Sequence, residues 1–248
     1  MKHKILIFCS CLLLFISCKK EENKPASVNE QAVASQLKLS FAFKVGNRPY
    51  FKDTLYTLNG RTLKFRTVNF YVSNFELQGT DSVTKIPQSY LLVKPGKTDF
   101  VFPLKKQAYS KLSFAVGLDS VANHANPADY SPNHPLYFQN ENMHWDWNTG
   151  YIFTKTEGWV DTTEAGNQFP VTNFSYHLGT MDVYRKLEFP KTITFSGDTA
   201  LVKFEIDIEA YLKDVDFLQE LETSSITPRD NYLAVKIANN SSLAFQIK

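Results

Sequence analysis

Residues 143–153 decide the expected fold, and they read MHWDWNTGYIF. Apolar and polar residues alternate over the first five positions, which is the period of a half-buried strand. The apolar face of that strand would hold Met143, Trp145 and Trp147. The polar face would hold His144 and Asp146, and residues 148–150 supply turn chemistry before a second strand begins. The simplest interpretation is an aromatic hairpin that fills a β core, because aromatic residues in strands mostly serve packing.

Strand patterns flank this hairpin on both sides. Runs with β periodicity or short apolar runs bounded by turn residues occur at 37–45, 63–77, 89–93, 100–104, 112–117, 171–178, 184–195, 200–208, 232–237 and 243–247. Helical spacing appears over 208–221. We therefore expect an all-β fold, an antiparallel β-sandwich or flattened barrel with long loops and one short helix. The loop over 119–142 is too long for a plain connection and carries His124 and His134.

The first seventeen residues have the pattern of an export signal. Lys2 and Lys4 precede an apolar run over 5–16 that is too short to span a bilayer. Residues 15–18, FISC, resemble a bacterial lipobox, with Cys18 as the lipidated first residue of the mature chain. We predict a lipoprotein signal peptide over 1–17, a flexible tether over 18–36 and one β domain over 37–248.

Charge and cysteine content narrow the classes of function. The chain has 27 Lys and Arg against 25 Asp and Glu, and loss of two signal lysines leaves 25 of each. A net charge near zero argues against nucleic acid or an anionic membrane surface as a partner, so the lipid anchor is the expected membrane contact. Cys9 and Cys11 leave with the signal and Cys18 is acylated, so any metal site lacks thiolates. Imidazole and thioether are then the donors suited to copper. No acid–base or nucleophilic pattern is present, and we do not expect an enzyme.

Six short motifs follow one another along the domain. They are FYVSN at 70–74, GLD at 117–119, NH at 123–124, MHWDWNTGY at 143–151, EG at 157–158 and FSYHLG at 174–179. Together they resemble the MbnP-like family of exported copper-binding proteins, which has many lipoprotein members in Bacteroidetes. The resemblance covers nearly the whole domain, and the hairpin motif is its most specific part.

The resemblance implies a β-rich protein that binds one copper ion. Characterised relatives use two histidines and a tryptophan oxidised to kynurenine by a partner diheme peroxidase of the MbnH type. Carried onto this chain, the histidines are His124 and His177, and the oxidised position is Trp145 or Trp147. The resemblance also implies an outer-membrane lipoprotein, on the periplasmic face or at the cell surface.

Met143 and His144 are further metal candidates within the hairpin motif. The family usually has Tyr or Phe where this chain has His144. One interpretation makes His144 an additional ligand, and the other makes it a surface replacement for an aromatic residue, which we favour.

A second hypothesis makes the protein a non-metal surface lipoprotein that binds a glycan, a peptide or an envelope partner. Its aromatic platform would consist of Trp145, Trp147, Tyr151 and Trp159. Geometry separates the two hypotheses, because copper requires histidines that converge near a tryptophan, whereas a platform requires exposed rings in a row.

Overall fold

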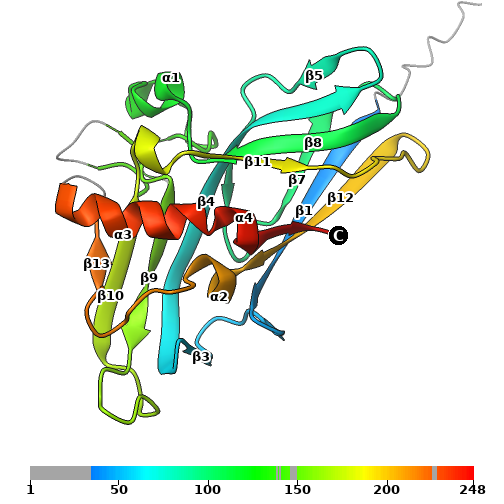
Figure 1. Ribbon diagram of the computed structural model, residues 1–248. Coiled ribbons are helices and arrows are strands. Elements are labelled where there is room, and N and C mark those ends of the chain that lie inside the picture. The colour runs from blue at the N-terminus through cyan, green and yellow to red at the C-terminus, as the bar shows by residue number, and fades with distance from the viewer. Residues whose placement is uncertain (1–34, 138, 140, 146–149, 225–227) are drawn as a thin grey trace, which may run out of the picture. The chain divides into compact units, whose positions relative to one another are not determined.

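The structure is a computed structural model that describes residues 35–248 apart from 138, 140, 146–149 and 225–227. The described residues belong to one compact unit. Strands dominate it, as Figure 1 shows. Among the helices in the described ranges, none has the length and apolar character needed to cross a membrane.

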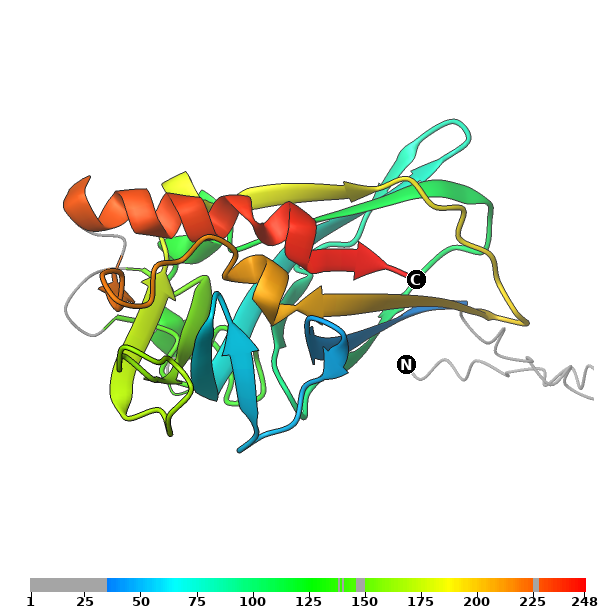
Figure 2. The same ribbon diagram turned by 60° about the horizontal axis from the view of Figure 1, so that its bottom comes forward.

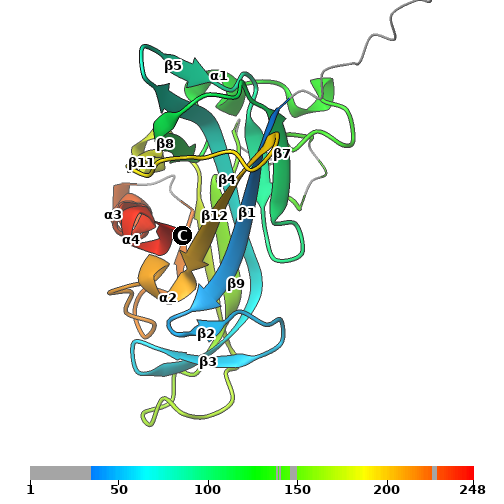
Figure 3. The same ribbon diagram turned by 90° about the vertical axis from the view of Figure 1, so that its right-hand side faces the viewer.

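A five-stranded sheet brings the two ends of this unit together. Its strands are β1 (Gln36–Val45), β2 (Arg48–Pro49), β7 (Asp99–Pro103), β12 (Thr199–Asp207) and β14 (Phe245–Ile247). β1 pairs in parallel with β12 along nearly its whole length, and Figure 3 shows the two strands side by side. Alternate residues of β1 are buried, from Leu37 to Val45, as the sequence pattern predicts.

A nine-stranded sheet carries the candidate site. Its strands are β3 (Leu55–Leu58), β4 (Arg61–Gly79), β5 (Val83–Lys85), β6 (Tyr90–Val93), β8 (Tyr109–Val116), β9 (Thr154–Val160), β10 (Thr172–Leu178), β11 (Arg185–Phe189) and β13 (Glu222–Thr223). β4 is central, since β3, β5, β6, β8 and β9 all pair with it. A bulge between Ser73 and Glu76 interrupts its pairing with β8.

The core lies between the two sheets and is largely aromatic. Phe41 of β1 stacks on Phe204 of β12 with ring centroids 5.2 Å apart. Phe114 of β8 approaches Phe204 to 5.2 Å and Phe75 of β4 to 5.3 Å. The Phe114–Phe204 contact joins the inner faces of the two sheets, which confirms the predicted all-β sandwich. Two strand pairs, β1 with β12 and β10 with β13, are parallel within this mostly antiparallel arrangement.

The helical elements are short except for one. They are α1 (Ser120–Asn123), η1 (Pro127–Asp129), α2 (Ile208–Tyr211), η2 (Met181–Val183), α3 (Pro228–Asn239) and α4 (Ser241–Ala244). Figure 2 shows α3 and α4 following one another and leading into β14, beside β12.

The strand predicted over 232–237 is wrong, because those residues belong to α3. The short apolar run suggests a strand, but its buried positions follow helical spacing. Tyr232 is 72% exposed, and the buried residues are Leu233, Ala234, Ile237 and Ala238. Proline at the first helical position also favours a helix that begins at Pro228.

The helix expected over 208–221 is much shorter than its spacing predicts, because α2 ends at Tyr211. Asn59 donates side-chain hydrogen bonds to the carbonyls of Leu212 and Val215, at 3.1 and 2.9 Å. Asp214 has a positive φ of 64°. Leu212, Val215 and Phe217 are therefore buried in an irregular segment that another loop holds in place.

Candidate functional site

The described part of the hairpin follows the predicted alternation of faces. Met143 and Trp145 are buried, at 1% and 6% exposure, whereas His144 is half-buried. The Trp145 N–H donates to the Gly150 carbonyl at 3.2 Å, and the Ile152 N–H donates to the Met143 carbonyl at 2.8 Å. Residues 146–149, which include Trp147 and the first two residues of the turn predicted over 148–150, lie outside the described residues.

Met143 and Trp145 pack against the large sheet. The Asn69 side-chain amide lies 3.9 Å from the Met143 sulfur. The Trp145 ring covers Gly179, where an added Cβ would lie only 2.6 Å from Trp145 Cη2 and 2.2 Å from the Tyr151 carbonyl oxygen. Gly179 is thus required by this close approach of ring and backbone. Both apolar side chains serve to seat the hairpin on the sheet.

A four-residue helix, α1, positions His124. Asp119 caps its first turn, accepting from the Ala122 N–H at 2.9 Å, and His124 forms its C-terminal cap. His124 Nδ1 lies 2.7 Å from the Ser120 carbonyl oxygen. A carbonyl only accepts, so Nδ1 is the nitrogen that carries the proton, and in the neutral ring Nε2 keeps its lone pair. This is the arrangement in which a histidine binds a metal through Nε2.

His124 and His144 line the same surface hollow, of about 260 Å³. Its other described lining residues are Asn123, Ala125, Asn126, Pro127 and Gly150. The His144 ring stands edge-on to the Tyr151 ring, with centroids 4.9 Å apart, so the aromatic core holds it from one side. Two imidazoles from segments twenty residues apart therefore face one small space.

Asn123 joins these two segments. Its side-chain oxygen accepts from the Tyr151 N–H at 2.8 Å. Gly150 packs directly on it, since an added Cβ there would lie 3.2 Å from the same oxygen. Asn123 is itself buried. The sequence predicts no role for Asn123. Its position directly before His124 in the NH motif is the only sequence feature that points to it.

His177 lies on β10 and is bound by a carboxylate on β9. His177 Nε2 is 2.8 Å from Glu157 Oε1. Glu157 also accepts from the Thr67 hydroxyl at 2.8 Å and contacts Arg66 at 3.1 Å. Burial raises the pKa of Glu157, but hydrogen bonds from His177 and Thr67 and the charges of Lys155 and Arg66 outweigh it and lower that pKa to about 2. Glu157 is ionised, so His177 Nε2 is the donor.

The histidines predicted as a pair, His124 and His177, thus take different surroundings. His177 is not among the described residues that line the His124 hollow. No group of three or more His, Cys, Asp or Glu that would suit a metal occurs in the described parts of the chain.

His134 organises the long loop. Its ring stacks on Tyr130 with centroids 4.3 Å apart, and its Nδ1 accepts from the Leu136 N–H at 3.1 Å. Burial lowers the pKa of His134. Because Nδ1 is used by backbone of the same loop, His134 has a structural explanation.

The described members of the platform in the second hypothesis, Trp145, Tyr151 and Trp159, do not form an exposed row. Trp145 and Tyr151 are buried in the core. Trp159 instead lines a separate apolar hollow of about 300 Å³, beside the exposed Phe169 and Val171.

Comparisons with known proteins agree with this architecture. The family model MbnP matches residues 34–229. A search of the curated proteins finds no match. Among solved structures, MbnP from Methylosinus trichosporium is similar with a TM-score of 0.60 and 18% identity, covering 86% of this chain and 97% of that one.

Proposed function

This chain belongs to the MbnP family, and from that membership and its two-histidine hollow we propose that it is an exported copper-binding protein. The proposal assigns it to copper uptake, storage or handling and gives it no catalytic step. The observation that carries it is the shared hollow of His124 and His144.

The donor set suits copper better than the hard cations. Imidazole nitrogen is a good ligand for copper, whereas calcium and magnesium require several oxygen ligands. The described lining of the hollow contributes two imidazoles and no carboxylate. The Ser120 carbonyl accepts from His124 Nδ1 and so fixes the proton on that nitrogen. The lone pair of Nε2 is then the one that would bind a metal.

We propose His124 and His144 as the protein ligands within the described residues. His144 then acts as the additional ligand and not as a surface replacement. Met143 and Trp145 support the hairpin from the core, which makes Trp147 the better candidate for oxidation to kynurenine. His177 is the alternative second histidine, and its bond to Glu157 resembles the carboxylate support that metal-bound histidines often have.

We propose that Cys18 carries a lipid that anchors the chain in the outer membrane, facing the periplasm or the cell surface. An MbnH-type diheme peroxidase would be the partner that oxidises the tryptophan. Intact mass of protein from its native host tests both, because acylation and conversion of tryptophan to kynurenine each change the mass by a known amount.

Competitive copper titration tests the ligand assignment. We expect His124→Ala and His144→Ala each to weaken copper affinity by more than the ~10–100-fold that outer-shell residues contribute. His134→Ala is the matched control, since its ring serves the loop. Loss in His124→Ala and His177→Ala with normal binding by His144→Ala would move the second ligand to His177. Unchanged binding in all of these variants, or no binding by the wild type, would refute copper binding at this site.

A further inference from the structure

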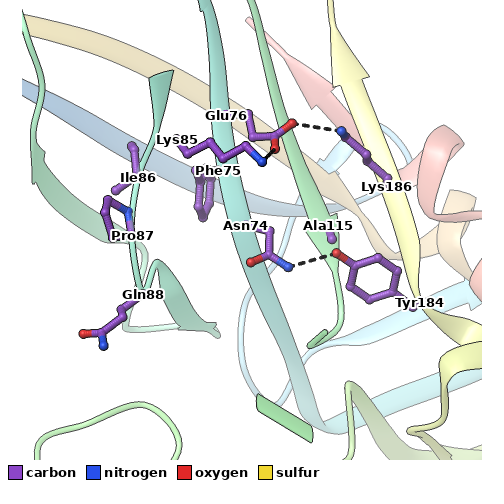
Figure 4. A pocket seen from close by; sticks show the side chains of 10 residues that line it. All are labelled: Asn74, Phe75, Glu76, Lys85, Ile86, Pro87, Gln88, Ala115, Tyr184 and Lys186. Carbon is purple, nitrogen blue, oxygen red and sulfur yellow. Dashed lines mark hydrogen bonds and ion pairs between the residues drawn. The ribbon is translucent and has the colours of Figure 1, made fainter. Parts of the chain in front are cut away.

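The bulge in β4 places Asn74 in an unusual backbone conformation. Asn74 has a φ of 57°, in the left-handed region, which Asn and Asp tolerate better than other non-glycine residues. Its side-chain Nδ2 donates to Asp119 Oδ2 at 3.1 Å and to the Tyr184 hydroxyl at 3.0 Å. Figure 4 shows the bond to Tyr184. Asn74 thus connects the central strand to Asp119, the residue that caps the start of α1.

The Asp119 carboxylate accepts hydrogen bonds from two elements. Its Oδ2 accepts from Asn74 Nδ2 of β4, and its Oδ1 accepts from the Ala122 N–H of α1 at 2.9 Å. From there the backbone continues the connection, since the Asn123 N–H donates to the Asp119 carbonyl at 2.8 Å. His124 follows as the C-terminal cap, with its Nδ1 on the Ser120 carbonyl.

Helix α1 needs such an anchor because it is too short to be stable by itself. Isolated helices of fewer than about twelve residues are marginal in water, and α1 has four. Its direction, and with it the position of His124, therefore depends on the side chains that fix its two ends. Asp119 fixes the start to β4, and Asn123 fixes the end to the hairpin through Tyr151.

The charged groups near Asn74 have partners of their own. Asn74 and Glu76 both line a hollow of about 370 Å³. Glu76 forms ion pairs with Lys186 at 2.9 Å and with Lys85 at 3.5 Å. Figure 4 shows these pairs beside Asn74 and Tyr184. Glu76 therefore offers a matched control, since it shares the hollow but belongs to a different set of interactions.

We infer that Asn74 and Asp119 are positioning residues for the metal site, acting through α1 on His124. The inference rests on the proposed copper function for its consequence in binding. Its structural part, that the pair sets the state of the His124 ring, holds with or without metal. It also unites two motifs, FYVSN at 70–74 and GLD at 117–119, that lie far apart in the sequence.

A reciprocal exchange tests the inference. Asn74→Asp and Asp119→Asn each place two like groups against one another, whereas the double variant restores one donor and one acceptor. Aspartate accepts the left-handed conformation at 74, and asparagine caps a helix about as well as aspartate at 119. We expect each single variant to weaken copper affinity ~10–100-fold and to change the copper EPR spectrum. The double variant should recover both, and Glu76→Gln should change neither.

A metal-free measurement separates this inference from the proposed function. The ¹⁵N chemical shifts of His124 report which ring nitrogen carries the proton, so they should change in the single variants and return in the double variant. Lower melting temperatures with an unchanged His124 ring and unchanged affinity would overturn the inference, as would a double variant that does not recover. If the wild type bound no copper, the proposed function would fail, and the ¹⁵N shifts would still decide whether the pair positions His124.

Discussion

Replacing Glu157 by Gln removes a carboxylate of β9 that binds side chains of both β4 and β10. Glu157 is 8% exposed. It contacts His177 and Thr67 at 2.8 Å each, Arg66 at 3.1 Å and Lys155 at 3.8 Å. Glutamine keeps the shape of the side chain but cannot carry the charge that these donors stabilise. We therefore expect the variant to be less stable than the wild type at neutral pH.

The size of the effect follows from the pKa. Glu157 has a pKa of about 2 in the folded chain, against an ordinary value of 4.5. At about 1.36 kcal/mol per pKa unit this corresponds to an upper limit of ~3 kcal/mol. Arg66 is 56% exposed, so solvent screens part of the interaction, and ~1–2 kcal/mol is the expected loss. Because the folded pKa is lowered, this stability is present above pH 4.5 and is lost as the pH falls toward 2.

Urea unfolding at several pH values between 7 and 2 provides the measurement. The difference in unfolding free energy between wild type and Glu157→Gln should be largest at pH 5–7 and should shrink below pH 4.5. Glu188→Gln is the control, because Glu188 is exposed and pairs with Lys111 at the surface. A wild-type advantage that stayed constant down to pH 2.5 would contradict this account of the carboxylate.

Three further substitutions test the packing around the site and the core. Gly179→Ala should lower the unfolding free energy by ~1–3 kcal/mol, because the new Cβ meets the Tyr151 carbonyl at 2.2 Å and the Trp145 ring at 2.6 Å; unchanged thermal unfolding would refute that close approach. Phe114→Ala should remove ~3–5 kcal/mol in urea unfolding, since the fully buried ring joins both sheets; Phe51→Ala, at an exposed ring, is the control. Asp207→Ala should cost ~1–2 kcal/mol, because Asp207 Oδ1 accepts from the N–H groups of Glu209 and Gly46 at 3.0 and 2.9 Å; a change no larger than that of the exposed Asp198→Ala would contradict the capping role.

The sequence predicts strands well wherever one face is buried. The alternation from Leu37 to Val45 identifies β1 because every second residue enters the core. It fails over 232–237, where a short apolar run is compatible with either a strand or a helix. The helix over 208–221 fails for a different reason, since Asn59 comes from a distant loop and takes the carbonyls of Leu212 and Val215. Such long-range hydrogen bonds leave no local pattern.

The candidate site was predictable in its parts but not in its assembly. The alternation in the hairpin correctly assigns Met143 and Trp145 to the buried face and His144 to the other. It does not show that His144 and His124 share a hollow, because their approach depends on Asn123 binding the Tyr151 N–H. Partner choice of this kind is a tertiary property, and motif order alone does not determine it.

The parallel pairing of β1 with β12 has a consequence for how the chain acquires its structure. Gln36 and Thr199 are hydrogen-bonded through their side chains although 163 residues separate them. Contacts between such distant residues slow folding, because a very long loop must close before the pairing stabilises anything. During synthesis the first strand has no β12 to pair with until most of the chain has been made. Folding of the sandwich is therefore expected to wait until the polypeptide is nearly complete.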